Sequence, residues 1–91
     1  MAEPEHQLDV RRLLCPLPVI RTQDRVAQLL PGAVLEVLCT DPGVLHDIPA
    51  WCRIHGHQYL GARRDGFEIR LRLRVMAGAT APGKAGSDAL A

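Results

Sequence analysis

Apolar and polar residues follow two different periods along this chain, and the changes of period mark its predicted elements. Strands are expected where apolar and polar residues alternate and where apolar residues follow one another without interruption. Four strands are predicted, at residues 6–12, 33–40, 57–63 and 67–75. The second of them is almost entirely apolar and rich in β-branched residues, as is typical of a central strand. The last two are joined by Arg64-Asp65-Gly66, which predicts a hairpin.

Between these strands the period changes to that of a helix. From Pro16 onward, apolar residues are expected on one helical face. That face comprises Val19, Ile20, Val26, Ala27, Leu29 and Leu30. Pro31-Gly32 is expected to end this helix. A second helix is predicted to start with Asp47 as its N-cap and Pro49 in its first turn, and to end at Gly56.

The last strand predicts the arrangement of the whole domain. Its alternation predicts one buried face and one exposed face. The apolar set is Phe67, Ile69, Leu71, Leu73 and Val75, and the polar set is Glu68, Arg70, Arg72 and Arg74. Both helices must then cover the same side of the sheet. The order β-α-β-α-β-β predicts an α+β fold, a two-layer α/β sandwich with a four-stranded mixed sheet and two helices on one face.

Length and composition limit the chain to one small domain. We expect a folded domain over residues 6–76, whereas residues 77–91 are small, polar and rich in glycine and expected to be a disordered tail. The net charge of +1 provides no strong attraction to nucleic acid or membrane. Neither a signal peptide nor a membrane-spanning run is expected. Three cysteines without a C-x-x-C pair argue against a disulfide framework and a zinc site. We therefore expect a cytoplasmic protein with reduced thiols, no metal and no cofactor.

The tetrapeptide Cys15-Pro16-Leu17-Pro18 carries the candidate chemistry. Proline is tolerated in the first turn of a helix, so Pro16 is predicted as the first helical residue and Cys15 as the N-cap. Unpaired N–H groups and the positive end of the helix dipole favour a thiolate at that position. The pKa of the Cys15 thiol is therefore predicted to lie below that of free cysteine, and Cys15 is the candidate nucleophile.

The chain resembles the TusA (SirA-like) family of sulfur-carrier proteins from about Leu8 to Arg74. The motifs that carry the resemblance are Leu8-Asp9, Leu13-x-Cys15-Pro16-x-Pro18, Pro31-Gly32, Thr40-Asp41-Pro42, Asp47-Ile48-Pro49-x-Trp51-Cys52 and Gly56-His57. The resemblance implies a sandwich similar to the C-terminal domain of bacterial translation initiation factor three. It also implies a sulfurtransferase in which Cys15 receives a persulfide sulfur from a cysteine desulfurase or a rhodanese-like donor. An acceptor relay protein would then take the sulfur for tRNA thiolation, molybdenum cofactor synthesis or sulfur oxidation.

The chain departs from the family pattern at Arg12, where the family usually has glycine. If this position requires a positive φ, arginine is strained there. Arg12, together with Arg11, is expected to help hold an anionic sulfur. Pro16 and Pro18 are expected to support the thiolate by rigidifying the first turn.

The other candidates have structural explanations beside the functional ones. Asp41 is expected as a turn residue with a possible accessory role near the thiol, and Cys39 and Cys52 as core residues. His55 and His57 form a weak metal signal. The row formed by Arg70, Arg72 and Arg74 is either a solvated face or a docking surface for an acidic partner or for RNA. With one Phe, one Tyr and one Trp, direct sequence-specific nucleic-acid binding is not expected.

Three functions remain open from the residues. A sulfur carrier, acting as a monomer in transient complexes, is the first. The second is a non-catalytic interaction or regulatory module on the same fold. The third is a thiol redox sensor in which Cys15 is oxidised and resolved by Cys52 or a partner.

Overall fold

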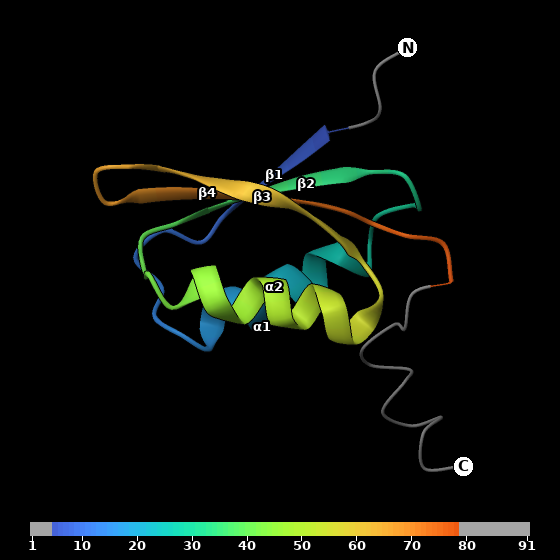
Figure 1. The fold of residues 1–91 in the computed structure, drawn as a ribbon, viewed down its shortest axis with the longest axis horizontal. Helices are drawn as coiled ribbons and strands as arrows, with labels where there is room; N and C mark the ends of the chain where they lie inside the picture. Colours follow the sequence, from blue (N-terminus) through green and yellow to red (C-terminus); the bar gives the residue numbers. More distant parts are fainter. Residues whose placement is uncertain (1–4, 79–91) are drawn as a thin grey trace.

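The four strands form a single sheet in the order β1-β2-β4-β3, with two helices packed against it (Figure 1). The computed structural model describes residues 5–78, so the predicted tail beyond residue 78 lies outside the described residues. The elements are β1 (Glu5–Asp9), α1 (Leu17–Val26), β2 (Val34–Cys39), α2 (Val44–His55), β3 (Gln58–Asp65) and β4 (Glu68–Arg74). The predicted order β-α-β-α-β-β and the α+β class are confirmed.

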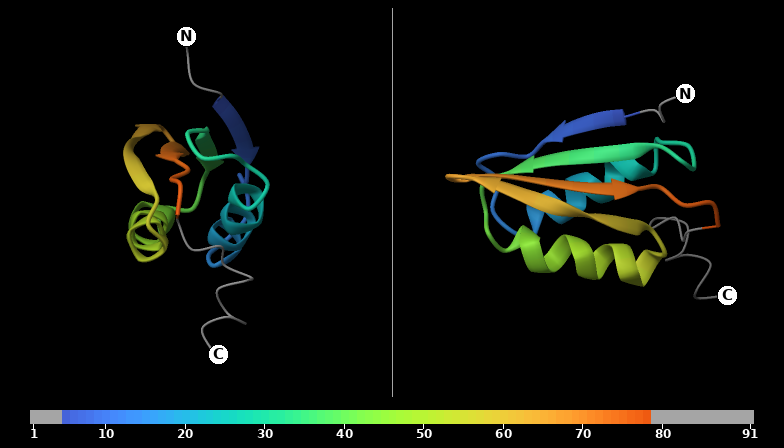
Figure 2. Two further views of the ribbon diagram at one scale, coloured as in Figure 1. Left: turned by 90° about the vertical axis from the view of Figure 1, so that its right-hand side faces the viewer. Right: turned by 45° about the horizontal axis from the view of Figure 1, so that its top comes forward.

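The sheet is mixed, and both helices lie on the same side of it. Strand β1 runs parallel to β2, whereas β2 and β3 both pair antiparallel with β4. Figure 2 shows α1 and α2 side by side beneath the sheet, with the opposite face uncovered. Strand β2 is central, as its apolar sequence predicted. The two-layer arrangement with one open sheet face is therefore confirmed.

The core lies between the helices and one face of β2 and β4. Directly opposite pairs such as Leu35–Leu73 and Val37–Leu71 are fully buried on this face. The prediction that alternation in β4 separates a buried from an exposed face is correct for Ile69 through Val75. It is wrong for Phe67, which is 86% exposed.

The position of the hairpin turn explains the exposure of Phe67. Strand β3 continues to Asp65, and the loop consists of Gly66 and Phe67 rather than Arg64-Asp65-Gly66. Gly66 has a φ of 62°, as in the first central position of a type II′ turn, where glycine is favoured. Phe67 therefore belongs to the turn and is not part of the buried face.

Helix α1 is shorter than predicted and buries a different face. It ends at Val26 instead of continuing to Pro31, and the next residues form turns with i→i−3 bonds, such as Leu29 N–H to Val26 O at 3.0 Å. Thr22 is buried, whereas Ile20 is 45% exposed. The Thr22 hydroxyl donates to the Pro18 carbonyl at 2.8 Å, so burial leaves it hydrogen-bonded.

Helix α2 begins four residues before its predicted start. Gly43 is the N-cap, so Asp47 and Pro49 both lie within the helix and Asp47 is not a cap. The predicted end is correct, since Gly56 has a φ of 82° and the His57 N–H bonds to the Cys52 carbonyl at 2.9 Å. The early start places the side chain of Asp47 one turn into the helix.

Candidate functional site

The candidate site lies at the edge of the sheet where the parallel strands β1 and β2 both end. Cys15 lies in the connection from β1 to α1, and Asp41 lies in the connection from β2 to α2. Parallel strands bring their carboxyl ends to the same edge, where functional loops commonly meet. The connection after β1 is hydrogen-bonded to β2 through Val10 N–H and Leu38 O (2.8 Å) and to the connection after β2 through Arg12 N–H and Thr40 Oγ1 (2.9 Å).

Asp41 fixes the backbone around the cysteine. Its Oδ2 accepts the Cys15 N–H at 2.8 Å, and its Oδ1 accepts the Gly43 N–H at 3.0 Å. These two bonds hold the pKa of Asp41 below its ordinary value, so the side chain is an anion. Asp41, which the sequence suggested as an accessory residue, is thus in direct contact with the backbone of Cys15.

The N-cap prediction for Cys15 is wrong by one residue. Helix α1 begins at Leu17 with Pro16 as its N-cap, at φ −93° and ψ 9°, following a cis Cys15–Pro16 peptide bond. Pro18, not Pro16, is the proline in the first turn, where its missing N–H has no helical partner. Cys15 therefore precedes the helix.

The sulfur of Cys15 lies against the start of α2. A Cβ placed on Gly43, the N-cap of α2, would be 3.0 Å from Cys15 Sγ and 3.4 Å from Asp41 Oδ1. The cysteine is partly buried and packs against the hydrophobic core. Gly43 thus leaves the space that the sulfur occupies.

The prediction of a lowered thiol pKa is contradicted by these surroundings. Burial, followed by hydrogen bonds with Asp47 and Asp41 and the repulsion of their negative charges, raises the pKa of the Cys15 thiol to about 12. Carboxylates accept the thiol proton and repel a thiolate. These surroundings favour the neutral thiol of Cys15 over the thiolate.

The helix N-termini do not offset this effect because their N–H groups already have partners. In α1, the N–H groups of Leu17 and Val19 bond to the carbonyl oxygens of Leu14 (2.9 Å) and Pro16 (3.1 Å). In α2, the first four N–H groups bond in the same way. Their acceptors are the carbonyl oxygens of Asp41, Pro42 and Gly43. A sulfur beside such a terminus gains little from the donors themselves.

Arg12 has the positive φ that was considered for this position, at 74°. Its neighbour Arg11 binds Asp9 through Nε (2.9 Å) and Nη2 (2.7 Å), and this pairing lowers the pKa of Asp9 to about 2. Arg11 and Arg12 line a shallow depression with Asp9 and Thr40. Support of an anionic sulfur by Arg12, Pro16 and Pro18 remains a prediction.

Exposed apolar side chains lie close to the cysteine along the chain. Leu14 is 70% exposed, Leu17 is 44% exposed and Ile20 is 45% exposed, all within five residues of Cys15. Leu14 directly precedes Cys15 in the connection, and the other two lie in the first turn of α1. An apolar rim around a reactive group is typical of a surface that is covered when a partner docks.

The other two cysteines are core residues, as predicted. Cys39, at the end of β2, and Cys52, in α2, are both fully buried. Burial raises the pKa of Cys39 to about 12 and that of Cys52 to about 11. Cys15 is therefore the cysteine of this chain that a partner protein can reach.

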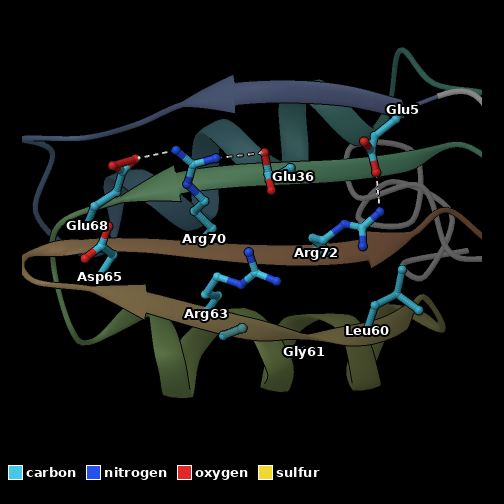
Figure 3. Close-up of a pocket in the computed structure, with 10 residues that line it drawn as sticks. Glu5, Glu36, Leu60, Gly61, Arg63, Asp65, Glu68, Arg70 and Arg72 are labelled. Carbon is cyan, nitrogen blue, oxygen red and sulfur yellow. Dashed lines mark hydrogen bonds and ion pairs between the residues drawn. The ribbon is translucent and has the colours of Figure 1, made fainter.

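Arg70 and Arg72 of the arginine row lie on the open sheet face among glutamates (Figure 3). Arg70 contacts Glu68 at 3.2 Å and Glu36 at 3.9 Å, and Arg72 pairs with Glu5. Arg74 Nη1 donates to Gln58 Oε1 at 3.0 Å. The row is thus exposed but largely matched by negative charge, and its docking role remains a prediction.

The histidines near the end of α2 pack around Trp51. His57 stacks on the indole with ring centroids 5.1 Å apart, and His55 lies 5.2 Å from it. Within residues 5–78 there is no group of three or more His, Cys, Asp or Glu side chains arranged to hold a metal. Nor does this part of the chain contain a helix long and apolar enough to cross a membrane.

Comparison with known proteins agrees with this fold and site. The family model described as "Sulfurtransferase TusA" matches residues 6–75, and the chain belongs to this family. Among curated proteins, it is 42% identical over 67 residues to the "Putative sulfur carrier protein YrkF" of Bacillus subtilis (strain 168). That match covers 74% of this chain but 36% of the relative, so the chain spans about a third of the relative's length.

Two residues of the site, Gly43 and Asp47, were not recognised as functional from the sequence. Both lie within the motifs that carry the resemblance or directly beside them, but Asp47 also fits the pattern of a helix cap, which concealed its proximity to Cys15. Only the start of α2 at Val44 places both residues beside the sulfur.

Proposed function

We propose that this protein is a sulfur carrier in which Cys15 accepts a sulfane sulfur as a persulfide and passes it to an acceptor protein. The observation that carries the proposal is the position of Cys15, which is partly exposed in the connection between β1 and α1 while Cys39 and Cys52 are buried. Membership of the TusA family and the similarity to a protein named as a sulfur carrier support the same role.

The proposed reaction requires no cofactor. Cys15 Sγ attacks the outer sulfur of a donor persulfide, and a new sulfur–sulfur bond forms as the donor's own sulfur–sulfur bond breaks. The donor leaves as a thiolate and takes up a proton, while the proton of Cys15 is released. In the second half-reaction a nucleophile of the acceptor attacks the outer sulfur, and Cys15 returns to a thiol.

Docking supplies most of the rate in this proposal. A domain this small offers few groups for acid–base work, whereas binding two reactive sulfurs side by side replaces a slow encounter in solution. The donor would be a cysteine desulfurase or a rhodanese-like protein, and the acceptor another relay protein. We further propose that the protein acts in the cytoplasm, as a monomer that forms transient complexes.

The test is persulfide loading followed by intact mass measurement. After incubation with a cysteine desulfurase and cysteine, the protein should gain the mass of one sulfur atom on Cys15. The Cys15→Ser variant should gain none, whereas Cys52→Ala should load with some loss of stability. Normal loading of Cys15→Ser would refute the proposal.

The same measurement separates the two other functions. Loss of two hydrogens under peroxide, without sulfur loading, would support a thiol redox sensor. No change under either treatment would support a non-catalytic module.

A further inference from the structure

The hairpin between β3 and β4 lies at the same end of the sheet as the candidate site. In the antiparallel pairing of β2 and β4, Ile69 is opposite Cys39, the last residue of β2. The hairpin turn therefore extends past the end of β2, and Figure 1 and Figure 2 show it at one end of the molecule with the connections after β1 and β2. Arg11 Nη1 lies 3.9 Å from Glu68 Oε2, so the connection that carries Cys15 is in contact with the start of β4.

Phe67 carries a large apolar side chain in this turn. Its side chain is the most exposed of the large apolar residues in the described part of the chain, at 86%. The ladder between β3 and β4 continues to the pair Asp65–Glu68, and Gly66, with a φ of 62°, has the conformation that a two-residue turn requires. The ring is therefore held in solvent on a short, regular turn, outside the hydrophobic core.

The same end of the molecule carries an arginine whose charge is not matched within the protein. In the described part of the chain, the guanidinium of Arg12 makes no hydrogen bond or ion pair, unlike that of Arg11. Arg12 N–H donates to Thr40 Oγ1 at 2.9 Å, and Cys15 N–H donates to Asp41 Oδ2 at 2.8 Å. Because Thr40 and Asp41 are consecutive, the backbones of Arg12 and Cys15 are held against one short segment.

We propose that this end of the molecule is the surface on which the sulfur donor protein docks, with Phe67 as its apolar anchor and Arg12 as its charged contact. The donor presents an apolar pocket to the phenyl ring and a carboxylate to the unmatched guanidinium, while its persulfide faces Cys15. Aromatic residues and arginines commonly dominate the binding energy of an interface. The inference rests on the proposed carrier function, because it specifies how the donor is bound.

The register of the strands places the anchor within reach of the same partner as the cysteine. Phe67 and Asp41 each lie two residues beyond the opposite pair Ile69–Cys39. Two residues span at most about 7 Å and opposite Cα atoms are about 5 Å apart, so the Cα atoms of Phe67 and Asp41 are at most about 20 Å apart. Asp41 is bonded to Cys15 N–H. A standard interface of about 800 Å² on each partner is wide enough to cover both places.

Two other exposed surfaces lack this combination of an apolar anchor and an unmatched charge beside the cysteine. On the open sheet face, Arg70 contacts glutamates and Arg72 pairs with Glu5. Leu30 is 79% exposed but lies before β2, at the opposite end of the sheet, where the N–H of Gly32 bonds to the carbonyl oxygen that follows β4 at 2.7 Å. Leu30 is therefore a matched control, since it is apolar, exposed and distant from the candidate site.

The experiment measures initial rates of persulfide transfer to the full chain at a series of concentrations of the chain. The donor is a cysteine desulfurase supplied with cysteine or, where that does not load the wild type, a rhodanese supplied with thiosulfate. Phe67→Ala should raise the KM for the chain roughly ten- to a hundredfold, because the ring is no longer buried on docking. The kcat should stay within about twofold, since the reacting sulfurs are unchanged.

The Arg12→Gln variant tests the charged contact without changing the backbone requirement, because both residues have a side chain at the same positive φ. Its KM should rise several-fold and should depend less on salt than that of the wild type. Arg12→Lys keeps the charge and should recover most of the affinity. Phe67→Leu keeps an apolar side chain and should recover part of it.

Three controls separate docking from folding and from the chemistry of the thiol. Leu30→Ala should leave the KM unchanged. The Tm of Phe67→Ala should not fall, because an exposed ring contributes no packing to the folded state. Glutathione persulfide, a small donor that does not dock, should load the wild type and Phe67→Ala at equal rates.

The outcomes distinguish this inference from the proposed function. A wild-type protein that gains no sulfur from either donor would refute the proposed function and the inference with it. A wild-type protein that loads, with an unchanged KM in folded Phe67→Ala and Arg12→Gln, would refute the inference alone. An equal rise of KM in Leu30→Ala would also overturn the inference, because the effect would then not depend on this end of the molecule.

Discussion

At the scale of single residues, Arg12 shows how a local conformation is maintained by its surroundings. Its φ of 74° is in the left-handed region, which costs a residue with a side chain roughly 1–2 kcal/mol. The chain accepts this conformation because the Arg12 N–H reaches Thr40 Oγ1 and thereby joins the ends of β1 and β2. The conformation serves to bring the connection before Cys15 across the sheet edge.

Replacing Arg12 by glycine should therefore stabilise the protein. Glycine removes the left-handed penalty but adds roughly 0.5–1 kcal/mol of unfolded-state entropy, so the net gain is expected to be about 1 kcal/mol or less. For a domain of this size that is a rise in Tm of at most roughly 4–8 °C. Differential scanning calorimetry measures it.

Arg11→Gly is the matched control for this change. Arg11 has no such strained φ and binds Asp9, so its replacement should lower the Tm. A fall in Tm for Arg12→Gly as well would show that the arginine side chain, and not its backbone, determines stability at this position.

At the scale of elements, the imidazole of His57 connects the end of α2 to the residues that follow β4. His57 stacks on Trp51, and its Nδ1 accepts the Met76 N–H at 3.3 Å. Burial, and to a smaller extent the neighbouring His55, lower the pKa of His57. The neutral ring thus completes the packing where the helix meets the sheet.

Stability should consequently fall as the pH decreases from about 6.5. An unfolded histidine binds a proton near that pH, whereas the folded His57 binds it only at lower pH. Between the two pKa values the unfolded state binds more protons than the folded state. The contribution of His57 to the free energy of unfolding is therefore fully present above about pH 6.5 and decreases as the pH falls toward the folded pKa. Urea denaturation followed by Trp51 fluorescence at a series of pH values measures the slope.

The His57→Gln variant should have a flatter dependence in this range. The exposed His46→Gln change is the control and should retain the wild-type slope. The explanation fails if His57→Gln loses stability on acidification as steeply as the wild type does.

At the scale of the whole molecule, the two layers give the two sheet faces opposite chemistry. The covered face encloses the core with Cys39 and Cys52, and the open face carries ion pairs between β4, β2 and β1. Exposed pairs of this kind contribute little stability, in the range of about 0–1 kcal/mol each. The apolar core therefore dominates the stability of the fold.

Alkaline pH should destabilise the protein through these thiols. Free thiols ionise near pH 8.5–9, while the folded pKa values are about 12 for Cys15 and Cys39 and about 11 for Cys52. Above about pH 9 the unfolded state binds fewer protons than the folded state, so stability is fully present below that pH and falls as the pH rises toward 11–12. Chemical denaturation between about pH 8 and 10 should show this decline, and Cys39→Val should reduce its slope. A stability that does not change across this range would contradict the raised pKa values.

Charge reversal tests whether the arginine row is a docking surface for an acidic partner or a solvated face. Reversing Arg70 and Arg72 to glutamate should slow sulfur transfer to the acceptor, and added salt should slow the wild type because exposed charges are screened within about 8–10 Å. Arg53→Glu, an exposed reversal on α2, is the matched control and should leave transfer unchanged. If single-turnover transfer rates are the same in all three proteins, the row is a solvated face neutralised by Glu5, Glu36 and Glu68.

The sequence by itself determined the elements, their order and the candidate cysteine. The alternation in β4 and the unbroken apolar run in β2 report burial directly, because a strand presents successive side chains to opposite faces. The position of Cys15, directly before Pro16 at a predicted strand–helix junction, separated it from the two cysteines on apolar faces. The exceptions were local: Phe67 follows the alternation but lies in the turn, and Ile20 and Thr22 exchange places because the Thr22 hydroxyl is satisfied within the helix.

Only the tertiary structure decided the state of the thiol. From the sequence, Cys15 next to Pro16 predicted a helix cap and a thiolate. In the folded chain, Asp41 and Asp47, which are distant from Cys15 in the sequence, raise the pKa of its thiol. The N–H groups at the starts of the helices are bonded to carbonyl oxygens and do not stabilise a thiolate. The physical reason is that a pKa depends on all charges and donors within a few ångströms, and the parallel pairing of β1 and β2 determines which residues meet there.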